Sequence, residues 1–87
     1  MEITWDAEKN EILKRDRGLD FETLAEAIQS GEVLEIVRNP NYPGQVIFMI
    51  LVDDYVCAVP AVPNDGCYFL KTAFKSRKLN KLFNGGA

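Results

Sequence analysis

The residues best suited to chemistry are five cations near the end of the chain. Every charged residue after Asp65 is basic, and the five lie within eleven positions: Lys71, Lys75, Arg77, Lys78 and Lys81. The remainder of the chain is acidic, and the whole protein has a formal net charge of −3. Exposed charges act within a Debye length of roughly 8–10 Å, so a concentrated cluster attracts polyanions even on an acidic protein. The cluster therefore favours RNA, DNA or an acidic protein partner as its ligand.

Arg77 and Lys78 are expected in the first turn of a short helix that Ser76 caps. The apolar positions of this helix, at spacing i, i+3 and i+4, are Leu79, Leu82 and Phe83. The positive end of a helix dipole disfavours cations by about 0.3–1 kcal/mol, whereas the free N–H groups there suit a phosphate. The placement therefore predicts an anion site. The alternative is an ordinary solvated face, on which the cations pair with carboxylates of the acidic helices.

Length and composition predict one domain over residues 1–83 and a flexible end at residues 84–87. Hydrophobic residues make up 47% of the chain and charged residues 26%, which is ordinary for a globular protein. No segment approaches the ~20 apolar residues of a membrane-spanning helix, so no membrane contact is expected. The first residues lack the basic and apolar regions of a secretion signal, and a cytoplasmic location is therefore expected.

The two cysteines, Cys57 and Cys67, are expected to have structural roles. The chain has no histidine and no CxxC spacing, so neither a metal site nor a cofactor is predicted. Cys57 has apolar neighbours and no histidine to activate it as a nucleophile, which favours core packing. A reducing cytoplasm also disfavours a disulfide between them.

Apolar periodicity and helix caps predict the elements that must position these side chains. The expected strands are residues 2–5, 33–37, 46–52, 55–59 and 67–73, and the expected helices follow the caps Asp6, Asp20 and Ser76. Gly18 and Gly31 are placed to end the first two helices. The strand over residues 46–52 is expected to be central, because it is apolar throughout. The order β-α-α-β-β-β-β-α predicts a two-layer α+β fold, in which a mostly antiparallel sheet carries two N-terminal helices and a short C-terminal helix.

A proline-containing loop at residues 39–44 is a second candidate for ligand binding. The ring of Tyr42 in this loop can stack on a base, and Arg38 beside it can contact a phosphate. Trp5 and Phe21 are expected in the core, because aromatic residues on strands and apolar helix stripes usually pack there. The candidate substrate-binding residues are thus Arg38, Tyr42, Lys75, Ser76 and Lys81.

Two stretches of the chain resemble a known family. The first comprises Trp5-Asp6, Lys9-Asn10, Gly18 and Phe21-Glu22, and the second Phe69-Leu70-Lys71-Thr72, Phe74 and Ser76-Arg77-Lys78. Their order and spacing, with the strand over residues 55–60, resemble the BrnT-type toxins, small bacterial ribonucleases of type II toxin–antitoxin modules. The resemblance implies a RelE-like fold and metal-independent RNA cleavage that inhibits translation. It also implies a cognate DNA-binding antitoxin, through which any contact with operator DNA would be made.

Cleavage of RNA by its own 2′-hydroxyl needs a base, cations that stabilise the phosphorane and an acid for the departing 5′-oxygen. A lysine crowded by other cations can act as the base, and Lys71 on the last strand is the candidate. Arg77 is expected to clamp the phosphorane with its planar fork, with Lys78 beside it. These three residues are the predicted catalytic group.

The chain also departs from the family pattern at two places. Arg17 stands where members often have a histidine, and Gln45-Val46 stands where they often have an arginine. These departures favour an alternative function, a decayed toxin that binds RNA or docks an acidic antitoxin without catalysis. The retained Lys71 and Ser76-Arg77-Lys78 favour cleavage, and the sequence leaves both functions open.

Overall fold

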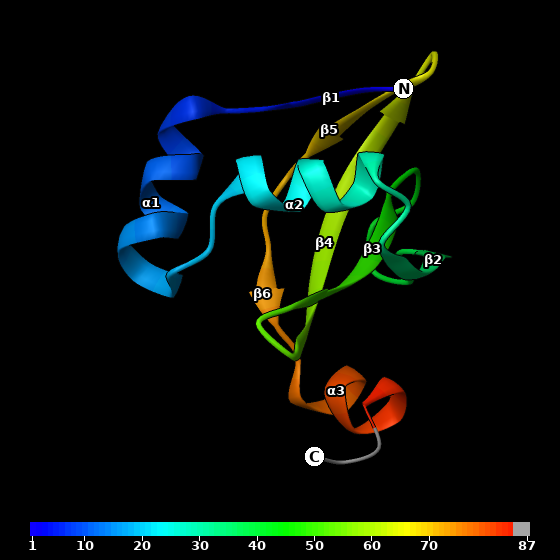
Figure 1. The fold of residues 1–87 in the computed structure, drawn as a ribbon. Coiled ribbons are helices and arrows are strands. Elements are labelled where there is room, and N and C mark those ends of the chain that lie inside the picture. Colours follow the sequence, from blue (N-terminus) through cyan, green and yellow to red (C-terminus); the bar gives the residue numbers. More distant parts are fainter. Residues whose placement is uncertain (85–87) are drawn as a thin grey trace.

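The computed structural model describes residues 1–84, which form three helices and six strands (Figure 1). In chain order they are β1 Glu2–Trp5, α1 Ala7–Arg17, α2 Phe21–Gln29, β2 Val33–Arg38, β3 Val46–Val52, β4 Tyr55–Asn64, β5 Cys67–Leu70, β6 Phe74–Lys75 and α3 Arg77–Phe83. The predicted α+β class is confirmed. Of the end predicted to be flexible at residues 84–87, only Asn84 lies within the described residues. None of the described helices has the length and apolar character needed to cross a membrane.

The sheet is open and mostly antiparallel, with strand order β1-β5-β4-β3-β2. Only β1 and β5 run parallel among the described pairs, and β6 pairs with β4 beyond the end of β5. The apolar run Val46–Val52 forms β3, an interior strand, while the centre of the strand order is β4. Helix α2 crosses one face of the sheet, as Figure 1 shows. It packs against β3 on that face.

The predicted helix caps are confirmed. The Asp6 carboxylate accepts hydrogen bonds from two backbone N–H groups of α1, at 2.8 and 3.1 Å. The Asp20 carboxylate accepts one from Thr23 N at 2.7 Å. Gly18 ends α1 with φ of 64°, a left-handed conformation that glycine adopts without the steric cost of a Cβ. Local chemistry thus sets where these helices begin and where α1 ends.

The core lies between the helices and the covered face of the sheet. The largest fully buried side chains of this core are Phe21, Phe48, Leu13, Leu24, Ile50, Leu70, Val59 and Cys57. Trp5 packs against this cluster, with its ring centroid 6.0 Å from that of Phe21. The predicted packing roles of Trp5, Phe21 and Cys57 are therefore confirmed, and both cysteines are free.

The strand predicted over residues 67–73 is wrong in its second half. Strand β5 ends at Leu70, and the chain pairs with β4 again only at Phe74. The reason lies in β4, where Pro60 accepts a hydrogen bond from Lys71 N at 2.8 Å but has no N–H to return one. The ladder is interrupted there, and residues 71–73 leave the sheet.

The apolar stripe predicted on the last helix does not pack as a core stripe. Leu82 is 72% exposed, and the buried residue of α3 is Asn80 instead. Asn80 Oδ1 accepts a hydrogen bond from Val56 N at 3.2 Å, and Val56 O accepts one from Ser76 N at 3.0 Å. Helix α3 therefore docks on backbone groups of β4 that no neighbouring strand covers, and this docking uses a polar side chain as an acceptor.

Candidate functional site

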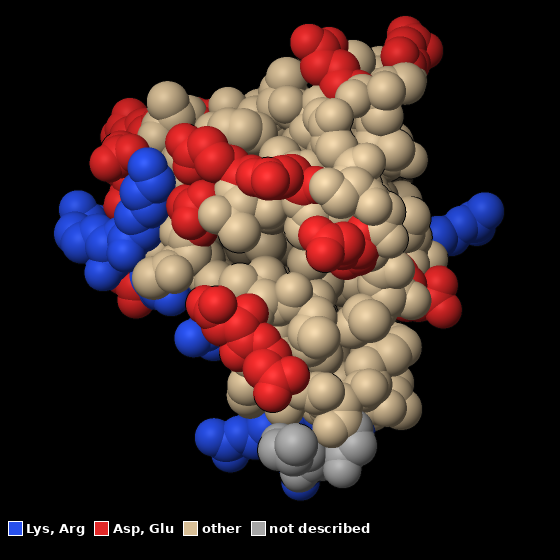
Figure 2. All heavy atoms as spheres, in the orientation of Figure 1, with Lys and Arg blue, Asp and Glu red and all other residues tan. Residues whose placement is uncertain are grey.

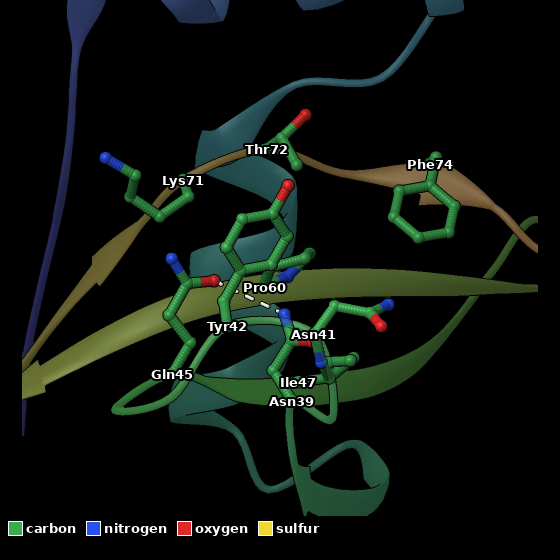
Figure 3. Close-up of a pocket in the computed structure, with 9 residues that line it drawn as sticks. All are labelled: Asn39, Asn41, Tyr42, Gln45, Ile47, Pro60, Lys71, Thr72 and Phe74. Atoms are coloured by element: carbon green, nitrogen blue, oxygen red, sulfur yellow. Dashed lines mark hydrogen bonds between the residues drawn. The ribbon is translucent and has the colours of Figure 1, made fainter.

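A pocket of about 430 Å³ lies on the face of the sheet that α2 does not cover. It is lined by Asn39, Asn41, Tyr42, Gln45, Ile47, Pro60, Lys71, Thr72 and Phe74 (Figure 3). Successive side chains on a strand point to opposite faces. Phe48 and Val59 point into the core, so their neighbours Ile47 and Pro60 point into the pocket, where they face each other across the strands and form its apolar floor.

The loop between β2 and β3 forms one wall and carries Tyr42. Asn39, which is largely buried, accepts a hydrogen bond from Asn41 N at 3.0 Å and donates one from Nδ2 to Gln45 Oε1 at 3.3 Å, the dashed line in Figure 3. Gln45 N also donates to Tyr42 O at 3.1 Å. These bonds fix the loop without holding the Tyr42 ring, which is 61% exposed. The Tyr42 ring is therefore exposed on a loop whose backbone is held by hydrogen bonds.

The segment that leaves the sheet after β5 forms the opposite wall. It contributes Lys71 and Thr72, and Phe74 follows on β6. The Lys71 ammonium lies 5.5 Å from the centroid of the Phe69 ring, within the range of a cation–π contact. The wall lies where the strand is broken. Pro60 therefore lies on the floor of the pocket and also interrupts the pairing that would continue the strand through residues 71–73.

A further side chain reaches this wall from α1. Arg17 Nη1 donates to Ala73 O at 2.6 Å and to Thr72 Oγ1 at 3.4 Å. These contacts join two segments 55 and 56 residues apart in the chain. Arg17 thus lies behind the wall that carries Lys71.

The structure separates the cations that the sequence grouped together. Lys71 and Tyr42 line the pocket, and Arg38 lines a hollow on the other side of the Tyr42 loop. Lys75 lies on β6, exposed, next to Phe74. Ser76 caps α3 as predicted, with its hydroxyl accepting from Leu79 N at 3.2 Å. The exposed cations of α3, which lies beyond β6 and outside the pocket lining, are Arg77, Lys78 and Lys81.

Charge is distributed unevenly over the surface. In Figure 2, acidic side chains gather over α2, and basic side chains lie at the side of α1 and at the end of the molecule occupied by α3. The ion pairs found among the described residues join α1 to itself or to α2: Lys14–Glu11, Lys14–Glu22 and Arg15–Asp16. Each of these ion pairs thus uses a cation of α1.

The two thiols are not activated nucleophiles. Burial raises the pKa of Cys57. A hydrogen bond to Glu2, at 3.1 Å from Sγ to Oε1, raises the pKa of Cys67. A raised pKa lowers the thiolate fraction near neutral pH, and the thiolate is the reactive form.

Sequence reasoning missed most of the pocket. The residues it did not single out for binding are Asn39, Asn41, Gln45, Ile47, Pro60, Thr72 and Phe74, together with Arg17 behind the wall. One signal was present, because a proline inside an apolar strand marks a place where the ladder loses a donor. The pairing that brings Tyr42 opposite Lys71 has no comparable local signal.

The pocket combines three kinds of binding group. Tyr42 and Phe74 offer aromatic surface, Asn41 and Gln45 offer amide donors and acceptors, and Lys71 offers a positive charge. No carboxylate is present among the described residues that line it.

Comparison with known protein families, with curated proteins and with solved structures finds no match for this chain.

Proposed function

We propose that this pocket binds single-stranded RNA, and that the protein is an RNA-cleaving toxin of a bacterial type II toxin–antitoxin system with a RelE-like fold. The observation that supports it best is the pocket itself, which is lined by the rings of Tyr42 and Phe74, by amide side chains and by Lys71. Base–aromatic stacking contributes about 1–3 kcal/mol per base, and a cation next to it suits the adjoining phosphate. The resemblance to BrnT-type toxins supports RNA as the nucleic acid.

An unpaired strand fits this site better than a duplex. The pocket is closed on one side by the sheet and on two sides by walls, so only a base that has left its stack can enter. The amides of Asn41 and Gln45 lie on either side of the Tyr42 ring and offer hydrogen-bonding groups to such a base. An acidic protein surface would use the cations but would leave the aromatic residues without a role.

The proposed reaction uses the 2′-oxygen of the bound nucleotide as nucleophile. This oxygen bonds to the adjacent phosphorus and loses its proton to a base, while the bond from phosphorus to the 5′-oxygen breaks and the 5′-oxygen takes up a proton. The products are a 2′,3′-cyclic phosphate and a 5′-hydroxyl. Lys71 is the group of the predicted catalytic three that lies in the pocket, and Arg77 and Lys78 are proposed to hold phosphates along the same strand.

One observation favours the second candidate, binding without cleavage. Among the nine lining residues the titratable side chains are Lys71 and Tyr42, with neither carboxylate nor imidazole to act as a base near neutral pH. A protein of this second kind would hold RNA, or a segment of its antitoxin, in the same pocket. In both candidate functions the protein has a DNA-binding antitoxin as its partner and acts in the cytoplasm. The two differ only in whether the bound RNA is cleaved.

The test of RNA binding uses a labelled single-stranded oligonucleotide and the variants Tyr42→Ala and Phe74→Ala. Each is expected to weaken binding by about fivefold to 150-fold, the equivalent of 1–3 kcal/mol per stacked base. Phe83→Ala is the matched control, because Phe83 is 38% exposed and Phe74 39%, but Phe83 lies on α3. Equal losses in Phe74→Ala and Phe83→Ala would place the binding site elsewhere.

Turnover is tested on the same oligonucleotide and on a copy with 2′-deoxyribose throughout. Cleavage of the first alone, with a 2′,3′-cyclic phosphate end and loss of activity in Lys71→Ala, is expected for the toxin. Binding of both without cleavage would leave the non-catalytic function. Arrest of bacterial growth on expression, relieved by the product of an adjacent gene that co-purifies with the protein, is the expected cellular outcome.

A further inference from the structure

The wall of the pocket at residues 71–73 lacks the support that a strand would give it. Its last ladder bond is Lys71 N to Pro60 O, because Pro60 cannot donate in return. Pairing with β4 resumes only at Phe74. Between these points the Ala73 carbonyl is turned to α1, and Ala73 itself is fully buried.

Arg17 supplies a hydrogen bond at this interruption. Its guanidinium donates to Ala73 O at 2.6 Å and also reaches Thr72 Oγ1 at 3.4 Å. Charged hydrogen bonds are stronger than neutral ones, and here the single nitrogen Nη1 reaches both oxygens. Arg17 is the last residue of α1, held in place by the left-handed Gly18 that ends the helix.

We infer that Arg17 is a positioning residue, which holds the wall of residues 71–73 so that Lys71 and Thr72 face Tyr42 across the pocket. The inference rests on the proposed function, because it assigns Arg17 a part in RNA binding at the same site. It adds that α1, outside the pocket lining, sets the shape of the pocket. Arg17 acts through the wall and does not itself contact RNA.

A direct phosphate contact by Arg17 is the competing explanation, and salt dependence separates the two. Each phosphate contact on a single strand contributes about −0.7 to the slope of log affinity against log salt. Arg17→Ala is expected to weaken RNA binding at least fivefold with an unchanged slope. A slope smaller in magnitude by about 0.7 would overturn the inference in favour of direct contact.

Arg17→Lys keeps the charge and the helix propensity, so it serves even if the alanine variant folds poorly. The lysine ammonium is a flexible and more strongly hydrated point charge, so it replaces the contacts of the guanidinium less well. Weakening by at least threefold is therefore expected, and affinity within twofold of wild type would overturn the inference. Arg15→Ala is the matched control, since Arg15 lies on the same helix, is 72% exposed and pairs with Asp16.

Amide hydrogen exchange without RNA tests the wall directly. Exchange at residues 72–74 is expected to accelerate about tenfold in Arg17→Ala and to stay unchanged in Arg15→Ala. Unchanged exchange in Arg17→Ala would overturn the inference whatever RNA does. If wild-type protein binds no RNA while exchange accelerates, the proposed function fails and Arg17 is left with a structural role alone, which also overturns the inference.

Discussion

Asn10 joins the first two helices, and its removal is expected to destabilise the protein measurably. Asn10 lies on α1 and is 3% exposed. Its Oδ1 accepts a hydrogen bond from Phe21 N at 2.8 Å, and its Nδ2 donates to Glu22 Oε1 at 2.9 Å. One amide therefore satisfies the first backbone N–H of α2 and orients an acidic side chain in its first turn.

The cost of Asn10→Ala follows from what is left unpaired. Phe21 is fully buried, so its N–H would lose its partner where water cannot replace it. An unsatisfied buried donor costs about 1–3 kcal/mol. With about 4–8 °C per kcal/mol for a domain of this size, a loss of about 2 kcal/mol lowers the melting temperature by roughly 8–16 °C.

Urea unfolding followed by circular dichroism measures this loss. Gln29→Ala is the control, because it removes an exposed amide from α2 and is expected to change stability by less than about 0.5 kcal/mol. If Asn10→Ala is as mild as the control, Phe21 N finds another acceptor and the reasoning is refuted.

Asn10→Asp adds a pH dependence with a defined sign. The substituted carboxyl would be buried beside Glu22, and both conditions raise its pKa above the unfolded value. The protonated form can donate to Glu22, so its contribution is fully present below the unfolded pKa and is lost as pH rises through the raised folded pKa. Stability relative to Asn10→Ala is therefore expected to fall from acidic to neutral pH, and a flat difference would contradict this.

Asp6→Ala removes the carboxylate that caps α1 and is expected to lower the free energy of unfolding by about 1 kcal/mol in urea titration; no change would mean that water replaces the cap. Pro60→Ala restores an N–H opposite Lys71, so the ladder should extend and RNA affinity should fall without a lower melting temperature; unaltered affinity would dissociate the pocket from the break. Glu2→Gln removes the main cause of the raised pKa of Cys67, and alkylation of this thiol by iodoacetamide near pH 8 is expected to be faster; an equal rate would indicate that Glu2 does not act on it.

Several parts of the fold were determined by local sequence. The Asp6 and Asp20 carboxylates and the Ser76 hydroxyl each accept a hydrogen bond from a backbone N–H within three residues, so a cap can be recognised without knowing what lies around it. Strand β3 is equally local, since it is one apolar run over residues 46–52. These predictions are confirmed because the groups that decide them are neighbours in the chain.

The pocket was decided by tertiary structure, beyond the one local signal that Pro60 gives. Whether residues 71–73 continue a strand depends on Pro60, which becomes their neighbour only when β4 and β5 pair. Which face of α3 is buried depends on the backbone groups of β4 that it covers. The Val56 N–H needs an acceptor, so α3 buries Asn80 and leaves Leu82 exposed. Strand pairing brings Tyr42 and Lys71 to the same pocket, although they are far apart in sequence. The long side chain of Arg17 reaches the same wall at Ala73. Composition and periodicity carry no signal for either contact.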